Sequence, residues 1–118
     1  DQQQEASKRR SFLDRLMMVM KEQYMNSELD GDHLADALGM SRSLLVKKMK
    51  SETGQTTSQF IKDYRLNIAR EMLSHNEGIR NITEIAYRVG FNDPKYFTRC
   101  FTKKYGISPS SYVDSMTK

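Results

Sequence analysis

Apolar residues recur every three or four positions over residues 11–25, and this period predicts an amphipathic helix. Residues 1–10 have no such period and are interpreted as a linker or a disordered tail. Residues 26–31 are rich in Asn, Ser, Asp and Gly, which is typical of a loop. The apolar positions of the predicted helix are Phe12, Leu13, Leu16, Met17, Met20 and Tyr24.

The rest of the chain contains one pattern twice. Residues 34–40, LADALGM, share their apolar, alanine and glycine positions with residues 85–91, IAYRVGF. Because the register shifts by a single residue between the first match and the last, the chain contains two copies of one supersecondary unit. The further matches pair Leu45 and Met49 with Phe97 and Phe101, Gly54 with Gly106, and residues 56–61 with residues 108–113.

Each copy carries the signals of two short helices joined by a tight turn. Gly39 and Gly90 follow the first helix of each copy, where a left-handed residue lets the chain turn. Ala35 and Ala86 lie four residues earlier, where a small side chain lets two helices cross closely. This arrangement is the signature of a helix-turn-helix. The predicted N-caps are Asp30, Ser41, Thr56, Asn81, Asp93 and Ser108, and the predicted C-terminal glycines are Gly54 and Gly106.

These signals predict an all-α domain over residues 11–118, with two small helix-turn-helix subdomains over about residues 29–55 and 81–106. A linker helix over residues 57–74 joins them, since its apolar residues cover a wide arc and therefore pack on more than one side. A C-terminal helix over about residues 109–117 completes the second copy.

Charge is distributed unevenly along the chain. Residues 1–40 hold 5 Lys and Arg against 8 Asp and Glu, a balance of −3, and residues 41–118 hold 14 against 7, a balance of +7. The sum is the net charge of +4. A basic C-terminal part favours a polyanionic partner, either nucleic acid or an acidic membrane surface.

Composition excludes several other classes of protein. No run of residues approaches the ~18 consecutive apolar positions of a membrane span, and the polar, acidic start is no signal peptide. A single cysteine fits a reducing compartment, so we expect a cytoplasmic protein without membrane contact. No nucleophile–base pair, metal-ligand cluster or phosphate-binding glycine loop is present, which predicts no enzyme activity and no cofactor. The start at Asp1 is interpreted as a sign that this is part of a longer protein.

The second helix of the first copy, residues 42–53, is the predicted recognition helix, because in a helix-turn-helix this element enters the major groove. Leu45 and Met49 are expected to face inward. The predicted base contacts are Ser43 and Lys47, by hydrogen bonds, and Val46, by a thymine methyl group. The predicted phosphate contacts are Ser41, Arg42 and Lys50. The alternative is a solvated basic face on an ordinary bundle helix.

The second copy repeats this arrangement over residues 94–105, with Phe97 and Phe101 expected in the core. Arg99 is the strongest single candidate, because a guanidinium binds guanine through two parallel hydrogen bonds; the alternative is a phosphate contact. The predicted base contacts are Lys95, Thr98 and Arg99, the predicted phosphate contacts are Asn92 and Lys103, and Lys104 is interpreted as a phosphate contact or a free solvated charge.

The remaining notable side chains have structural interpretations and open alternatives. Cys100 is interpreted as a small semi-buried residue, and the alternative is a redox switch. His33 and His75 are expected on the surface. The methionines of the first helix are interpreted either as core residues or as part of an interface to a preceding domain.

The chain resembles the DNA-binding domain of the AraC/XylS family of bacterial transcription regulators over about residues 29–113. The resemblance implies seven helices and an activator or repressor whose two units occupy successive major grooves, about 34 Å apart, on one face of an asymmetric site. By motif position it places base contacts on Ser43, Val46, Lys47, Pro94, Lys95, Thr98 and Arg99. The matching motifs are Leu34-Ala35…Gly39-Met40-Ser41, Arg65-Leu66…Ala69…Leu73, and Ile82-x-Glu84-Ile85-Ala86…Gly90-Phe91-x-Asp93…Tyr96-Phe97…Phe101…Gly106…Pro109…Tyr112.

The resemblance also implies partners. A methionine-rich first helix after a polar segment is similar to the output domains of response regulators and hybrid two-component sensors. The expected partners are double-stranded DNA, RNA polymerase, an N-terminal receiver or sensing domain outside this sequence, and a second copy of the chain on DNA. The rival hypothesis is a helical protein-interaction module that uses the first helix or the linker helix and binds no DNA.

Overall fold

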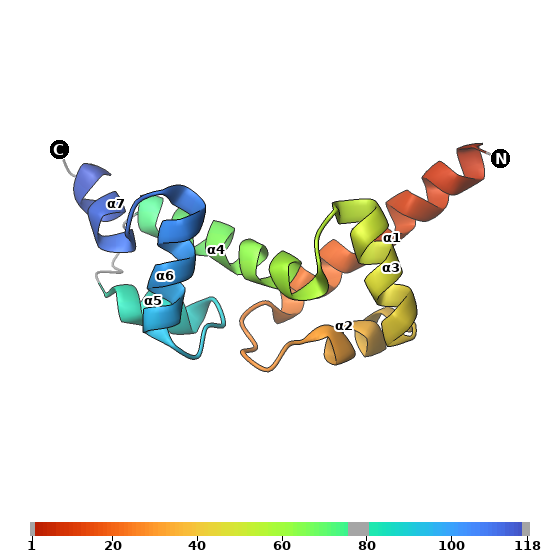
Figure 1. Cartoon of the computed structure of the whole chain (residues 1–118), viewed down its shortest axis with the longest axis horizontal. Helices are drawn as coiled ribbons and strands as arrows, with labels where there is room; N and C mark the ends of the chain where they lie inside the picture. The colour runs from red at the N-terminus through yellow and green to blue at the C-terminus, as the bar shows by residue number, and fades with distance from the viewer. Residues whose placement is uncertain (1, 76–80, 117–118) are drawn as a thin grey trace. The chain divides into compact units, whose positions relative to one another are not determined.

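The structure, a computed structural model, describes residues 2–75 and 81–116, with side chains from residue 11 onward. All regular structure in this described part of the chain is α-helical, and seven helices are present there, which confirms the predicted all-α fold (Figure 1). Asp1 and residue 117 of the predicted C-terminal helix lie outside the described residues. The helices are α1 (Gln2–Gln23), α2 (Gly31–Leu38), α3 (Arg42–Thr53), α4 (Thr57–His75), α5 (Ile82–Arg88), α6 (Pro94–Tyr105) and α7 (Pro109–Met116).

The prediction of a linker or disordered tail over residues 1–10 is wrong for residues 2–10, because α1 begins at Gln2. This segment has no apolar stripe, but its Gln, Glu, Ala, Lys and Arg residues are among the stronger helix formers. Such a segment extends an amphipathic helix that is already anchored further along the chain. Helix propensity therefore accounts for the helical conformation of residues 2–10, where apolar periodicity predicts no helix.

The chain divides into two compact units. The first unit comprises residues 1–24 and 29–62, and the second comprises residues 25–28 and 63–118. The helix α4 contributes its first residues to the first unit and the remainder to the second.

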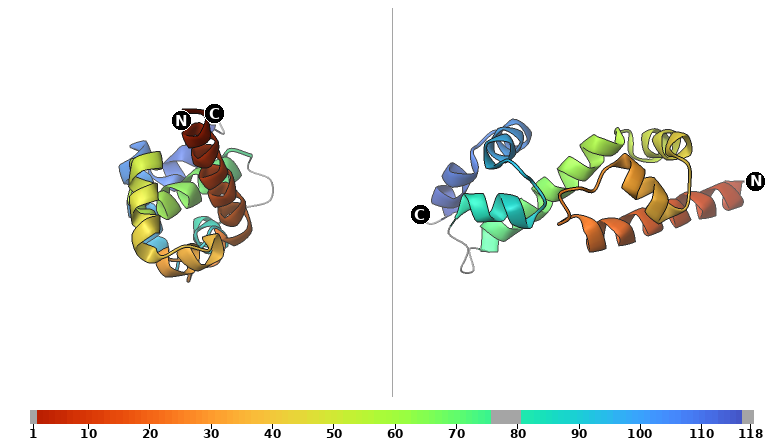
Figure 2. Two further views of the ribbon diagram at one scale, coloured as in Figure 1. Left: turned by 90° about the vertical axis from the view of Figure 1, so that its right-hand side faces the viewer. Right: turned by 90° about the horizontal axis from the view of Figure 1, so that it is seen from below.

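The core of the first unit lies among three helices, since α2 contacts both α1 and α3 (Figures 1 and 2). Each helix turns its apolar stripe inward, because burying this surface is the main favourable term in folding. Arg15 donates a hydrogen bond to the carbonyl of Leu38, which ties α1 to the end of α2. The buried side chains are Phe12, Leu16 and Met20 on α1, Leu34 and Leu38 on α2, and Leu45 and Met49 on α3.

The second unit is built on aromatic packing around α6. Phe97 and Phe101 are fully buried, and the ring of Phe91 meets Phe97 edge-on at 5.2 Å. Arg65 of α4 donates a hydrogen bond to the carbonyl of Asn26 at 2.7 Å, which holds the segment 25–28 against this unit. Burial lowers the pKa of the Arg65 guanidinium. Further buried residues are Leu66, Ala69 and Leu73 on α4 and Ile85, Ala86 and Val89 at α5.

The capping interactions confirm the helix starts expected from the sequence. Thr56 and Gln59 form a reciprocal box, in which each side chain accepts a hydrogen bond at 3.2 Å from the other residue's backbone N–H. Gly39 and Gly90 have φ angles of 69° and 103°, a region that strongly favours glycine, and each is the turn residue between the two helices of its unit. The other confirmed N-caps are Asp30, Ser41, Asn81, Asp93 and Ser108.

The cap of α2 predicts a pH dependence of stability. The Asp30 carboxylate accepts a hydrogen bond from the backbone N–H of His33 at 2.9 Å, and this bond, with the nearby imidazole, holds the pKa of Asp30 below its ordinary value of 3.8. The ionised cap therefore stabilises the fold above pH 3.8, and this contribution is lost as the pH falls through the lowered pKa.

Asp30→Asn keeps a capping side chain but removes the charge, so we expect it to be less stable than the wild type at neutral pH. The difference should disappear in acid, as measured by urea unfolding over a pH series. A difference that stays constant through the acid range would contradict this account of the cap.

None of the helices in the described residues is both long and apolar enough to cross a bilayer.

Candidate nucleic-acid interface

The predicted recognition helix of the first unit is α3, which has one buried face and one exposed face. Ser41 starts the helix by accepting a hydrogen bond from the N–H of Leu44 at 3.1 Å. Leu45 and Met49 are fully buried, which confirms the predicted inward face. Three side chains on the opposite face are exposed and available to a ligand, namely Ser43, Val46 and Lys47. Half of the Val46 surface is exposed, so this apolar side chain is not needed for packing.

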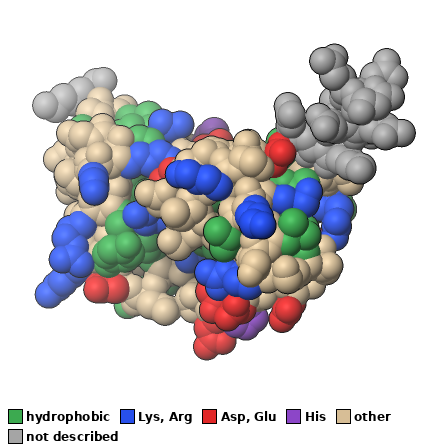
Figure 3. Space-filling view, turned by 45° about the vertical axis from the view of Figure 1, so that its right-hand side comes forward, with side chains coloured by type: hydrophobic (Ala, Val, Ile, Leu, Met, Phe, Trp, Pro, Cys, Tyr) green, Lys and Arg blue, Asp and Glu red, His purple; other side chains and the backbone are tan. Residues whose placement is uncertain are grey.

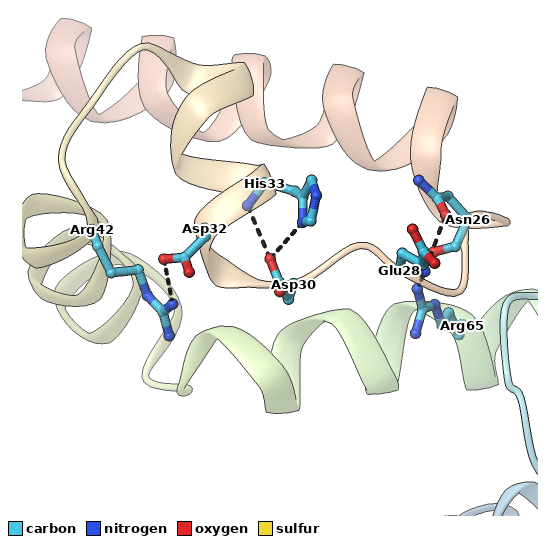
Figure 4. A network of polar contacts seen from close by, with 7 residues as sticks. All are labelled: Asn26, Glu28, Asp30, Asp32, His33, Arg42 and Arg65. Atoms are coloured by element: carbon cyan, nitrogen blue, oxygen red, sulfur yellow. Dashed lines mark hydrogen bonds and ion pairs between the residues drawn. The ribbon is translucent and has the colours of Figure 1, made fainter.

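Arg42, at the start of α3, is engaged within its own unit. Its guanidinium lies 3.0 Å from the carboxylate of Asp32 on α2, and both side chains are more than half exposed (Figure 4). The guanidinium also fills the space beside Gly31, where an added Cβ would lie 2.3 Å from the Arg42 Cζ. A phosphate contact by Arg42 therefore requires this pair to open, which costs little because exposed ion pairs contribute ~1 kcal/mol or less.

The other basic residues of α3 differ in how far their side chains are exposed to solvent. Lys47 and Lys50 are exposed, while Lys48 is half-buried, with its ammonium 5.4 Å from the ring centre of Phe12. Lys and Arg side chains are spread over the face drawn in Figure 3, and acidic side chains gather around a histidine at its lower edge. Within the first unit, α2 and its cap carry the exposed acidic residues Asp30 and Asp32, whereas α3 carries four basic residues, Arg42, Lys47, Lys48 and Lys50.

The predicted recognition helix of the second unit is α6, which like α3 has one buried face and one exposed face. The Asp93 carboxylate caps it, with Pro94 at its first position. Phe97 and Phe101 are buried as predicted. Of the predicted contact residues, Asn92, Lys95, Arg99 and Lys103 are exposed, and Thr98 is half-buried. Each unit thus gathers its predicted base-contacting residues on the solvent face of one helix.

Two contacts on α6 were not among the predictions made from the sequence. The Arg99 guanidinium lies over the ring of Tyr96, 5.7 Å from its centre. The Lys104 ammonium lies 3.6 Å from the Asp63 carboxylate and donates to the Asp63 carbonyl at 3.4 Å, which ties α6 to α4. Lys104 is therefore not a free charge, and the interpretation that left this possibility open is corrected.

An open hollow of about 420 Å³ lies where the starts of α5, α6 and α7 meet. Four polar residues line this hollow. Lys95 and Thr98 were predicted as base contacts from the sequence, whereas Thr83 and Ser110 were not predicted as site residues. The predicted N-caps Asn81 and Ser108 were the sequence signal that could have pointed to Thr83 and Ser110, because these caps mark helix starts, where backbone N–H groups are free. The lining consists of Ile82, Thr83, Pro94, Lys95, Thr98, Pro109 and Ser110.

The residues with structural interpretations lie as expected. Cys100 is buried on α6, which supports its interpretation as a small packing residue. His33 and His75 are exposed, and the imidazole of His33 contacts the capping carboxylate of Asp30 (Figure 4). Within residues 11–75 and 81–116, no three His, Cys, Asp or Glu side chains gather so that they could hold a metal ion.

Comparison with protein families matches residues 34–115 to the family described as a helix-turn-helix domain. The chain is 37% identical over 101 residues to "Histidine kinase P4" of Formosa agariphila, a match that covers 86% of this chain and 7% of that protein. It is 33% identical over 94 residues to the "HTH-type transcriptional activator RhaS" of Escherichia coli, a match that covers 80% of this chain and 33% of that protein. The chain thus spans a third or less of the length of these relatives.

Solved structures resemble the chain over most of its length. The C-terminal domain of AraT, a response regulator from Geobacillus stearothermophilus, matches with a TM-score of 0.78 at 29% identity, covering 86% of this chain and 83% of that chain. The DNA-binding domain of AdpA, a global transcriptional factor in complex with a target DNA, matches with a TM-score of 0.78 at 25% identity, covering 87% and 90%. At this coverage both similarities include both helix-turn-helix units.

Proposed function

We propose, on the premise that this chain belongs to the AraC-type family of helix-turn-helix domains, that α3 and α6 enter adjacent major grooves of one DNA duplex. The family match and the named relatives support a DNA-binding domain of a transcription regulator rather than an enzyme domain. The proposed function of this chain is sequence-specific binding of double-stranded DNA for transcription regulation. The observation that carries the two-helix proposal is the repeated division of α3 and α6 into a buried face and a polar, basic, exposed face.

The proposed base contacts differ in chemistry between the two units. On α3, Ser43 and Lys47 donate hydrogen bonds to base edges, and Val46 contacts a thymine methyl group. On α6, Lys95 and Thr98 donate to base edges, and Arg99 binds guanine with both of its terminal N–H groups. The small side chains on α3 support a first unit that makes fewer hydrogen bonds to bases than the second.

The proposed phosphate contacts flank these base contacts and supply most of the affinity, since releasing counterions from the DNA backbone is the dominant sequence-independent contribution. Arg42 exchanges Asp32 for a phosphate when DNA binds, and the exposure of both side chains supports this exchange. The contacts are Ser41, Arg42 and Lys50 in the first unit and Asn92 and Lys103 in the second.

The proposed setting is the DNA-binding part, residues 11–118, of a larger cytoplasmic regulator with an N-terminal receiver or sensing domain. The names of the relatives support this setting, because they include a histidine kinase, a response regulator and a transcriptional activator. Met18 of α1 is 65% exposed, which supports a contact between this helix and such a domain. We further propose that the regulator contacts RNA polymerase and binds DNA as a homodimer.

A selection of bound sequences from a random duplex pool, followed by a salt titration of binding to the selected site, tests the proposal. We expect an asymmetric site that spans two major grooves, and an affinity that falls steeply as the salt concentration rises. A site confined to one groove would contradict the use of both helices. Enrichment of no sequence, with salt-insensitive binding or none, would favour the rival protein-interaction module.

A further inference from the structure

Tyr96 is an aromatic residue of α6 that the hydrophobic core does not require. Its side chain is 43% exposed, whereas the neighbouring rings of Phe97 and Phe101 are fully buried. An exposed tyrosine in the first turns of a recognition helix lies on the side of the helix that is available to a ligand. Its contacts therefore bear on the interface as well as on stability.

The ring of Tyr96 is held by neighbours within the second unit. The buried ring of Phe91 lies 6.1 Å away at an angle of 55°, which supports one side of Tyr96 from the turn before α6. One helical turn further along α6, the interaction with the Cys100 side chain raises the pKa of the Tyr96 hydroxyl above its ordinary value. These contacts restrict the orientation of the ring before any ligand binds.

The guanidinium of Arg99 lies over this ring, with its Cζ 5.7 Å from the ring centre. Residues three apart on a helix are neighbours, so the contact follows from the spacing of Tyr96 and Arg99. An arginine that binds both acceptors of a guanine must present two N–H groups in one plane, and a free side chain loses rotamer freedom to do so. Contact with a fixed aromatic face removes part of that cost in advance.

We propose that Tyr96 is a positioning residue for Arg99, and that its ring orients the guanidinium toward a single base pair of the site. The proposal rests on the proposed function, since it concerns how the second unit discriminates among bases. Tyr96 acts through Arg99 and makes no base contact of its own. The ring is the required feature, so phenylalanine should replace tyrosine whereas leucine should not.

The test compares Tyr96→Leu, Tyr96→Phe, Arg99→Ala and the double variant with leucine at 96 and alanine at 99. Binding is measured to the selected duplex and to duplexes with each base pair changed in turn. We expect Tyr96→Leu to weaken binding about two- to fivefold, with the loss confined to the base pair at which Arg99→Ala relaxes preference. Tyr96→Phe should match the wild type, and Tyr96→Leu should have no further effect once Arg99 is alanine.

A matched control is Tyr87→Leu, which replaces another exposed tyrosine of the same unit, on α5. It should leave the base preference unchanged, and thermal melting of all variants verifies that the fold is retained. Independent losses at Tyr96 and Arg99 that add in the double variant would overturn the proposal, because Tyr96 would then contact DNA itself. A uniform loss at every base pair would also overturn it.

Nuclear magnetic resonance of the free domain separates this inference from the proposed function. The Arg99 Nε–H resonance should carry a ring-current shift in the wild type and in Tyr96→Phe, and should lose it in Tyr96→Leu. An unchanged resonance in Tyr96→Leu would overturn the inference alone, with DNA binding intact. A wild-type domain without any base preference would overturn the proposed function, and this inference with it.

Discussion

Replacing Phe101 with alanine is expected to destabilise the second unit by about 3–5 kcal/mol, which is the usual loss for truncating a fully buried phenylalanine. Phe101 has no exposed surface, and its ring contacts Phe97 at 5.9 Å, Tyr105 at 4.7 Å and Tyr112 at 5.9 Å. Because Tyr112 belongs to α7, the truncation also removes a ring contact between α6 and α7. The stability of a small domain is only about 5–15 kcal/mol, so this loss is a large fraction of it.

Urea unfolding followed by circular dichroism measures the effect of Phe101→Ala. The matched control is Tyr87→Ala, an aromatic truncation at an exposed position of the same unit, which should change the free energy of unfolding by no more than about 0.5 kcal/mol. Because the chain divides into two units, the variant should show a separate early transition for the second unit. Equal losses for the two variants would contradict the central position of Phe101.

Replacing Arg99 with alanine is expected to cost about 1–3 kcal/mol of specific binding free energy, or about 5- to 150-fold in affinity, and to relax base preference at one end of the site. The exposed guanidinium is the group on α6 best suited to bind guanine with two hydrogen bonds. Its loss leaves the phosphate contacts in place, so binding to random duplex should change little. The measurement is the affinity for the selected site and for a random duplex at one salt concentration.

The control for Arg99→Ala is Lys103→Ala, which removes another exposed basic residue of the same helix. As a phosphate contact, Lys103 should contribute equally to all sequences, and its loss should reduce the slope of affinity against salt by about 1. An equal loss on selected and random DNA for Arg99→Ala would instead make Arg99 a phosphate contact.

Local signals predicted most of the helix boundaries, because a cap and the backbone group that it binds are two or three residues apart. Asn81 and Asp93 cap the helices whose starts they were predicted to mark. The inward faces of α3 and α6 followed from apolar residues four apart, Leu45 with Met49 and Phe97 with Phe101. The first turns of α1 were missed, since a helix without an apolar stripe leaves no period to detect.

Apart from the first turns of α1, the order of residues alone therefore determines where the helices of this protein lie. It also determines which sides of α3 and α6 are buried, and it carries the motifs of the family. The folded arrangement decides which basic side chains are engaged within the protein. Asp32 binds Arg42, and Asp63 binds Lys104, although these partners come from different helices. An ion pair depends on the distance between two charges in space, and for residues on different helices that distance is set by packing and not by separation along the chain.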